Sequence, residues 1–344
     1  MEGKVILEEH FSTELNNKFW DAKGEETRNG RAYAQDIERR LMDSDAYVTE
    51  MDRCGVDVCI LSLTSPGVQS VVDTKQAAEL AHSANDYAKL LMQKYPGRIE
   101  AFASVPMQNP AAGADVLEQA VKEFRFKGAL INGYSNVGPG DNVQYLDEEP
   151  VWEFWERVSK LNVPVYLHPR EPLPSQQRAL KGYPELGGSA WAFGLETSTH
   201  AVRLMLSGLF DKYPNVQIIL GHLGEGLPFL LPRLQHRLDA QREGLKGAKC
   251  LRRPSYYFAN NFYITTSGHF HTKQLHAAMA QIGVTRVLFS TDYPYEQMDA
   301  GCRWFDDLEM ENVAKAAIGR TNARNLFSLT LPDMGVSEIA GSAS

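Results

Sequence analysis

Eight short, nearly continuous apolar segments recur along the chain, and most of them are followed by a stretch of helical periodicity. Segments this apolar are typical of strands that are buried on both faces, as in a parallel sheet. Helical patterns lie between several of them, at residues 74–95, 110–124, 149–161 and 197–210. The predicted strands are residues 5–10, 58–64, 99–105, 127–133, 163–169, 216–222, 262–268 and 286–292.

This alternation over 344 residues predicts an α/β fold, and specifically a (β/α)₈ TIM barrel rather than an open doubly wound sheet. An open sheet that binds a dinucleotide carries Gly-x-Gly-x-x-Gly after its first strand, and the segment VILEEHF at 5–11 has no glycine. We expect one catalytic barrel domain over residues 1–330 and an extended C-terminal tail over 331–344. The long segments 12–37, after the first strand, and 170–189 are expected to be lids or disordered loops.

The composition argues against several classes of function. The chain has 35 basic and 43 acidic residues, a net charge of −8, and no basic cluster, which argues against nucleic acid or a membrane surface as a partner. The four cysteines show no Cys-x-x-Cys spacing and are expected to be reduced thiols. No apolar segment reaches the roughly 20 residues of a membrane span, and no secretory signal is recognisable. These features predict a soluble, cytoplasmic protein.

Ionisable side chains stand at the ends of several predicted strands. In a (β/α)₈ barrel the active site lies at the C-terminal ends of the strands. The first strand ends Glu8-Glu9-His10, and alternation directs Glu8 and His10 to one face and Glu9 to the other. The fifth strand ends in His168 and the eighth in Asp292, so these two residues could meet Glu8 and His10 at one point. Two imidazoles and two carboxylates suit a divalent ion such as Zn²⁺ or Mn²⁺.

Each of these residues also has a plainer interpretation. A lone histidine at a strand end is more often a hydrogen-bonded structural residue than a ligand, and Glu8 alone could be a buried acid paired with an arginine. The joint occurrence of four such residues on the expected rim favours the metal site. His222 ends the sixth strand, and His269 follows the seventh as a further rim candidate. The remaining histidines lie in helix-like stretches and are expected to be structural or solvated, namely His82, His200, His236, His271 and His276.

Several ordered motifs resemble those of a known family. The segments LEEHF, YLHPR, ILGHLGEGLP and LFSTDYPYE together resemble the metal-dependent decarboxylases of the amidohydrolase superfamily. The nearest pattern is that of the enzymes acting on ortho-hydroxybenzoates, the γ-resorcylate, 2,3-dihydroxybenzoate and salicylate decarboxylases. The resemblance runs in register from Gly3 to about Leu329 and includes GALING and IGRTNARNLF. It implies one divalent metal ion (Zn²⁺, Mn²⁺ or Mg²⁺) and no organic cofactor, with the ligands Glu8, His10, His168 and Asp292.

The resemblance also implies roles for residues outside the metal site. His222 and Glu225 would act as a hydrogen-bonded pair beside the substrate, a small aromatic carboxylic acid. Arg233 would reach the active site of a neighbouring subunit in a homo-oligomer, a tetramer or a dimer. The predicted substrate pocket further includes Phe193, Tyr295, Asn132 and Trp20. Taken alone, Glu225 could instead be an acid at a helix N-terminus, Arg233 a surface arginine, and the aromatic residues simple packing residues.

One feature separates the chain from the hydrolases that it resembles. Hydrolases of this superfamily commonly carry His-x-His on the first strand, and many have a lysine at the end of the fourth strand that bridges two metals. Here the first strand offers Glu8-x-His10, and the fourth ends Ile131-Asn132-Gly133. We therefore expect a one-metal site.

Decarboxylation of an aryl carboxylate is easier when the ring carbon is protonated before CO₂ leaves. An ortho-hydroxyl ionised by the metal directs electron density to that carbon. The resemblance implies Asp292 as the acid, with His222, oriented by Glu225, acting on the phenol oxygens. The reaction is reversible in principle. Salicylate, orsellinate, 2,3-dihydroxybenzoate and 2,6-dihydroxybenzoate all stay open as substrate types.

Three other functions stay open at this point. The first is a metal-dependent hydrolase of a lactone or amide, in which His222 or Asp292 activates water. The second is a decarboxylase of a non-benzoate acid, such as a semialdehyde-type or pyrimidine carboxylate. The third is a barrel kept only for binding or assembly, against which the four candidate ligands argue.

Overall fold

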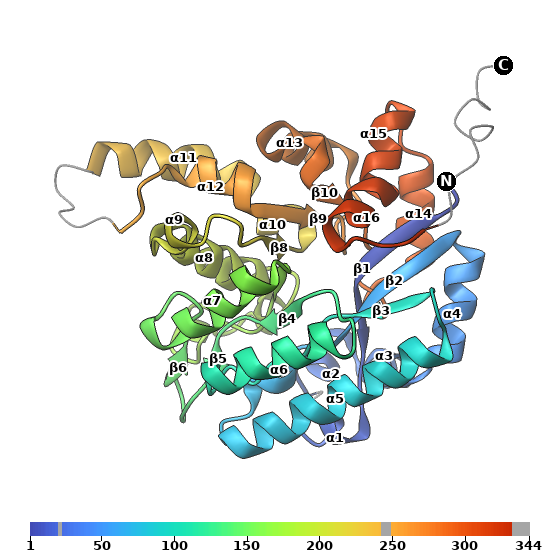
Figure 1. Ribbon diagram of the computed structural model, residues 1–344, viewed down its shortest axis with the longest axis horizontal. Coiled ribbons are helices and arrows are strands. Elements are labelled where there is room, and N and C mark those ends of the chain that lie inside the picture. The colour runs from blue at the N-terminus through green and yellow to red at the C-terminus, as the bar shows by residue number, and fades with distance from the viewer. Residues whose placement is uncertain (20–22, 242–248, 332–344) are drawn as a thin grey trace.

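The computed structural model describes residues 1–19, 23–241 and 249–331, and its strands form the inner wall of a barrel surrounded by helices (Figure 1). Each of the eight predicted strands is present, most of them shorter than predicted. They are β1 (Lys4–Phe11), β2 (Val56–Leu63), β3 (Ile99–Ala101), β4 (Ala129–Asn132), β7 (Val165–His168), β8 (Ile218–Leu220), β9 (Phe262–Thr265) and β10 (Val287–Leu288). A small antiparallel pair, β5 (Ser135–Asn136) and β6 (Val143–Gln144), follows β4.

All neighbouring barrel strands run parallel, in the orders β1-β2-β3 and β10-β9-β8-β7-β4. A parallel bridge between Ala103 and Ala129 joins the two sheets after β3. On the other side, the Asp292 N–H donates to the Glu8 carbonyl at 3.0 Å, which joins the loop after β10 to β1. These contacts link the two sheets at both edges, and the predicted (β/α)₈ barrel fold is confirmed.

Strand β1 contains an extra residue. Ile6 pairs with Cys59 and Glu9 pairs with Leu61, so three steps along β1 correspond to two steps along β2. This β-bulge allows Leu7 and Glu8 to face the barrel interior in succession, after which alternation resumes at Glu9. Leu7 belongs to the apolar cluster inside the barrel, whereas Ile6 packs with the helices outside it.

The predicted helices are largely present. Three of them correspond to α5 (Thr74–Lys94), α6 (Pro110–Lys122) and α7 (Trp152–Leu161). Asp73 and Asn109 cap α5 and α6 by accepting backbone N–H bonds, and Pro110 occupies the first turn of α6. The helix predicted over 197–210 is present but divided in two. The structure has α8 (Ala192–Leu206) and α9 (Leu209–Lys212), because Gly208 takes a left-handed conformation with φ 85° between them.

Residues 12–37 differ from the expectation of a disordered loop, because the described part of this segment is largely helical. It contains α1 (Glu14–Asn17), α2 (Lys23–Asn29) and most of α3 (Arg31–Met42). Ala34, Ile37 and Leu41 recur at helical spacing on α3 and are buried, which gives the segment an apolar face. Segment 170–189 holds only the short helical turns η3 (Gln176–Leu180) and η4 (Pro184–Gly187).

Further helices complete the outer layer. They are α4 (Ser44–Arg53), α10 (His222–Glu225), α11 (Leu227–Gln241), α12 (Pro254–Asn261), α13 (Thr272–Ile282), α14 (Met298–Asp306), α15 (Asn312–Ala316) and α16 (Asn322–Phe327), with the short turns η1 (Gly67–Ser70), η2 (Glu149–Val151), η5 (Val284–Arg286) and η6 (Ala317–Thr321). The division into a domain over 1–330 and a tail over 331–344 stays a prediction, since 332–344 lie outside the described residues. Cys54, Cys59 and Cys302 are free thiols, as predicted. In the described part of the chain, no helix is long and apolar enough to span a bilayer.

Candidate metal centre and active site

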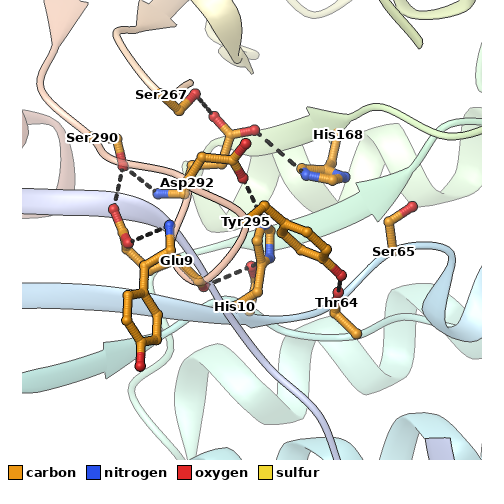
Figure 2. Close-up of polar contacts among 12 residues, drawn as sticks. Glu9, His10, Thr64, Ser65, His168, Ser267, Ser290, Asp292 and Tyr295 are labelled. Atoms are coloured by element: carbon orange, nitrogen blue, oxygen red, sulfur yellow. Dashed lines mark hydrogen bonds and ion pairs between the residues drawn. The ribbon is translucent and has the colours of Figure 1, made fainter. Parts of the chain in front are cut away.

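The ends of three barrel strands bring the four predicted ligands together. One ligand atom from each of Glu8, His10, His168 and Asp292 lies within 4.8 Å of the others. The His10 Nε2 atom is 3.5 Å from Asp292 Oδ1, and the His168 Nε2 atom is 3.5 Å from Glu8 Oε1. Figure 2 shows His10, His168 and Asp292 converging from separate segments. The predicted convergence at the barrel mouth is therefore present in the structure.

The two histidines are oriented so that Nε2 of each ring faces the centre. The Nδ1 atom of His168 lies 2.9 Å from the Pro169 carbonyl, to which it can only donate. The Nδ1 atom of His10 lies 3.1 Å from Ser62 Oγ, whose own hydroxyl donates to the Glu9 carbonyl. Both Nδ1 atoms are thus donors, and the lone pair stays on Nε2, as a metal ligand requires. Burial, together with nearby His10, holds the pKa of His168 well below its usual value, which keeps the ring neutral.

The Glu8 carboxylate is fully buried, and its two oxygens have different surroundings. Oε2 accepts hydrogen bonds from Tyr166, Thr265 and Ser267, with the Thr265 bond at 3.0 Å. Within the described residues, Oε1 makes no hydrogen bond, and neither does His10 Nε2. Burial raises the pKa of Glu8, because the ionised carboxylate lacks enough compensating positive charge. Unpartnered buried ligand atoms of this kind are what a divalent cation would satisfy.

Asp292 occupies a strained position in the loop after β10. Its φ is 68°, a left-handed conformation that costs a non-glycine residue about 1–2 kcal/mol and is often found at functional sites. Burial favours the neutral acid, but the imidazole of His222 beside it, by its charge and hydrogen bonding, helps to lower the pKa of Asp292 below its usual range. The carboxylate is therefore held ionised and aimed into the barrel mouth.

The pair His222 and Glu225 lies beside this cluster, on α10. The backbone of α10 is a left-handed turn, with φ of 51°, 54°, 83° and 55° along residues 222–225. The turn places His222 Nδ1 2.7 Å from Glu225 Oε1, while His222 Nε2 faces Asp292 Oδ2 at 3.5 Å. Burial disfavours the charged ring, but the carboxylates of Glu225 and Glu8 raise the pKa of His222 well above its usual value. Glu225 also lies two residues before the start of α11, so its interpretation as an acid at a helix N-terminus stays open.

Two predicted pocket residues lie next to the cluster. Asn132 ends β4 directly opposite His168, is buried, and its Oδ1 makes no hydrogen bond within the described residues. The Tyr295 ring packs edge-on against the His10 ring with centroids 5.9 Å apart, and its hydroxyl pairs with Thr64. Both residues therefore adjoin the four-residue cluster.

Three other predicted site residues lie on α8, on α11 or outside the described residues. Phe193 is half-buried in the first turn of α8, and Arg233 is exposed on α11. Trp20 lies outside the described residues. The rim candidate His269 is half-buried and packs against the ring of His271 instead of joining the cluster.

The remaining histidines behave as predicted, although His271 precedes α13 and does not lie in a helix. His200 is buried and accepts a hydrogen bond from the Leu146 N–H at 3.0 Å, which is a structural role. The others are exposed, namely His82, His236, His271 and His276.

The sequence pattern did not reveal how segment 12–37 supports the site. The Tyr33 hydroxyl donates to the Tyr295 carbonyl at 3.0 Å, and Arg40 donates to the Pro294 carbonyl at 2.9 Å. Arg40 also lies over the Tyr293 ring at 4.4 Å. Helix α3 therefore holds the loop that carries Asp292. The only sequence signal for this role was the amphipathic spacing of α3 itself.

Comparisons with known proteins identify the class of protein that this barrel and site define. The model of the amidohydrolase family matches residues 17–329, and the chain belongs to that family. The γ-resorcylate decarboxylase of Polaromonas sp. (strain JS666 / ATCC BAA-500) is 44% identical over 335 residues, covering 96% of this chain and 99% of that protein.

Solved structures of similar proteins agree with this assignment. A 2,6-dihydroxybenzoate decarboxylase in complex with 2,6-dihydroxybenzoate superposes with a TM-score of 0.91 at 44% identity, covering 96% of this chain and 100% of that one. A dihydroxybenzoic acid decarboxylase from Polaromonas sp. JS666, with bound manganese and the inhibitor 2-nitroresorcinol, gives a TM-score of 0.88 at 44% identity, covering 96% and 98%. The predicted resemblance to hydroxybenzoate decarboxylases of the amidohydrolase superfamily is confirmed.

Gly221 provides a direct test of how tightly Glu8 is held. A methyl group at Gly221 would lie 2.7 Å from both Glu8 oxygens, and three hydroxyl groups that donate to Oε2 hold the carboxylate in place. We expect Gly221→Ala to displace the carboxylate and weaken Mn²⁺ binding by about 10-fold or more, as measured by calorimetry on metal-free protein. Gly187→Ala, whose methyl would meet nothing closer than 3.9 Å, is the matched control. Equal affinities of the two variants would show that Glu8 is not held where a ligand is needed.

Proposed function

We propose that this protein is a metal-dependent, non-oxidative decarboxylase that releases CO₂ from an ortho-hydroxybenzoic acid. The observation that carries the proposal is the buried cluster of Glu8, His10, His168 and Asp292, in which two ligand atoms make no hydrogen bond within the described residues. The names of the similar proteins favour 2,6-dihydroxybenzoate as the substrate and manganese as the ion. A cytoplasmic location, inferred from the composition, belongs to the same proposal.

The donor set fits one hard or borderline divalent ion, since it combines two imidazole nitrogens with two carboxylates. When bound, such an ion supplies a Lewis acid that favours the phenolate form of the substrate and holds its oxygens in place. Asn132 occupies the fourth strand end, where many hydrolases of the superfamily have a bridging lysine. This agrees with one metal and not two.

The side chains of this chain provide a route for the proton that replaces CO₂. Asp292 is ionised at rest, so it would first accept a proton from the His222 imidazolium beside it. It would then deliver that proton to the ring carbon that carries the carboxylate, and the ring would give up its aromaticity. The C–CO₂ bond then breaks, its electron pair returns to the ring, and the neutral CO₂ leaves. His222 has a raised pKa and lies 3.5 Å from Asp292, so its imidazolium can return a proton to the carboxylate. Glu225 keeps that ring oriented.

The substrate pocket would be completed by the predicted contacts. Asn132 and Tyr295 adjoin the cluster, as their placement beside His168 and His10 indicates. We retain Phe193 and Trp20 as further pocket residues on the strength of the family resemblance. Planar rings suit an aromatic acid because they can stack against it or meet it edge to face.

Metal removal and a substrate panel test the reaction. We expect chelator-treated protein to lose CO₂ release from 2,6-dihydroxybenzoate, and added Mn²⁺ to restore it, because the buried carboxylates need the cation to organise the site. CO₂ and products are measured for 2,6- and 2,3-dihydroxybenzoate, salicylate and orsellinate, with re-addition of Zn²⁺ and Mg²⁺ in parallel. A lactone offered under the same conditions serves as control. Hydrolysis of that lactone without any CO₂ release would replace the decarboxylase with the hydrolase.

Asp292→Asn tests the proposed acid. The amide cannot carry the transferred proton, so we expect kcat to fall roughly 10²-fold or more. Metal content is measured on the same samples, and only protein that retains its ion is compared. Asp299→Asn, which alters an exposed ion pair on α14, is the control. Near-normal CO₂ release by metal-loaded Asp292→Asn would exclude Asp292 as the acid.

We further propose that the chain forms a homo-oligomer through the surface around α11. Phe229 is 88% exposed and Leu230 48% exposed on this helix, which projects from the barrel in Figure 1. Trp191 and Leu195, at the start of α8, are also about half exposed. Clusters of large exposed apolar side chains are typical of protein interfaces. Arg233 follows Leu230 by three residues on α11, so a partner that covers one would lie close to the other.

A complementation experiment tests whether Arg233 acts in a neighbouring site. Arg233→Ala and Asp292→Asn are each expected to lower decarboxylation strongly when every subunit carries the change. If Arg233 serves the partner's site, co-expression of the two variants produces mixed oligomers in which some sites have both residues intact. We expect their activity, measured as CO₂ release per active subunit, to exceed that of either parent. Activity no higher than the mean of the parents would place Arg233 in its own subunit's site or outside the chemistry.

A further inference from the structure

Glu9 is a fully buried acid that the proposed reaction does not use. It lies on β1 between two ligands but on the opposite face, turned away from the barrel interior toward the loop after β10 (Figure 2). Its Oε1 accepts hydrogen bonds from Ser290 Oγ at 2.9 Å and from the Thr291 N–H at 2.8 Å. Its Oε2 accepts from the Tyr293 N–H at 3.0 Å, and the Thr291 hydroxyl donates to both oxygens.

These bonds connect Glu9 to both segments that supply carboxylate ligands. Thr291 and Tyr293 flank Asp292, whose backbone is held in the left-handed conformation. Ser290 Oγ, which donates to Glu9, accepts the N–H groups of Leu7 at 3.0 Å and Glu8 at 2.7 Å. Those two N–H groups belong to the bulge that turns Glu8 inward. One buried carboxyl group therefore fixes the bulge and the loop relative to each other.

We propose that Glu9 is a positioning residue that holds Glu8 and Asp292 at the spacing needed to bind the metal ion. The inference rests on the proposed metal site and on no step of the reaction. Glu9 does not face the ion. It acts through the backbone of Asp292 and through the bulge, so its loss should alter metal affinity more than the overall fold.

The chemistry of the contacts indicates which variant is informative. Each Glu9 oxygen accepts one backbone N–H, from Thr291 or from Tyr293. Glutamine has the same shape but only one acceptor oxygen, so either orientation of its amide points an NH₂ group at a backbone N–H. That donor–donor contact leaves a buried polar group unsatisfied and displaces one flank of Asp292.

The experiment compares Glu9→Gln with Glu100→Gln in the full-length protein. Glu100 is a partly buried acid on β3, two strands along the sheet from β1, and it pairs with Lys127. Mn²⁺ is titrated into metal-free protein by calorimetry, and unfolding temperatures are recorded with and without Mn²⁺. We expect the Mn²⁺ dissociation constant of Glu9→Gln to rise about 10- to 100-fold, and that of Glu100→Gln to stay within about twofold of the wild type.

A purely structural role for Glu9 would give a different result. It would lower the unfolding temperatures of the metal-free and Mn²⁺-loaded forms equally, leaving the Mn²⁺-induced increase and the dissociation constant at their wild-type values. That result overturns the inference while leaving the proposed function intact. A wild-type protein that binds no Mn²⁺ would instead overturn both.

Should Glu9→Gln fail to fold, Thr291→Val gives the same test. Valine removes the hydroxyl that donates to both Glu9 oxygens but keeps the side-chain shape and the backbone N–H. We expect a smaller loss of Mn²⁺ affinity in the same direction. Unchanged affinity of a folded Thr291→Val would overturn the inference.

Discussion

The carboxylates of Glu8 and Asp292 lie at one end of the barrel with little solvent around them, and each ionised group makes ionisation of the other more costly. The neutral ring of His168 brings no positive charge to this site, and the Nε2 atoms of His168 and His10 both face it. A divalent cation neutralises the negative charge of the two carboxylates, whereas an apolar ligand would leave it uncompensated. The folded chain therefore carries an electrostatic strain that metal binding relieves, and the position of the substrate follows from the position of the ion.

The support for this site comes from outside the barrel. Hydrogen bonds from Tyr33 and Arg40 on α3 fix the carbonyls of Tyr295 and Pro294, and Glu9 holds the other end of the same loop. A carboxylate that must stay in a left-handed backbone conformation needs such restraint on both sides, because the relaxed backbone would turn it away. The long segment after β1 thus helps to hold the loop after β10, the last strand of the barrel, in its conformation. The two segments are far apart in the sequence but adjacent in the closed barrel.

Much of the fold and the choice of candidate ligands could be predicted because both follow from short-range patterns. Buried parallel strands leave continuous apolar segments, and the rim of a barrel collects whatever follows them, as His168 and Asp292 do. The β1 bulge could not be predicted, because in a continuously apolar segment one inserted residue does not change the hydrophobic pattern. The left-handed turn at His222 was equally hidden, since its non-glycine residues disfavour that conformation and only tertiary contacts hold it. Family resemblance supplied the roles of Arg233 and Phe193, which the geometry of one chain does not test.

The triplet Glu8-Glu9-His10 shows why a buried strand can end in charged residues. Alternation assigns its members to two environments, so Glu8 and His10 reach the barrel interior while Glu9 reaches the adjoining loop. Each charge then has a specific function, either as a candidate ligand or as an acceptor for fixed backbone donors. A ligand on a flexible loop would lose conformational entropy when the ion binds, which weakens binding. A ligand whose backbone is already restrained by a neighbouring buried carboxyl group loses less conformational entropy when the ion binds. The candidate ligands Glu8 and His10 and the restraining residue Glu9 are consecutive on β1. When this strand becomes ordered during folding, two of the four candidate ligands are therefore positioned before the ion binds.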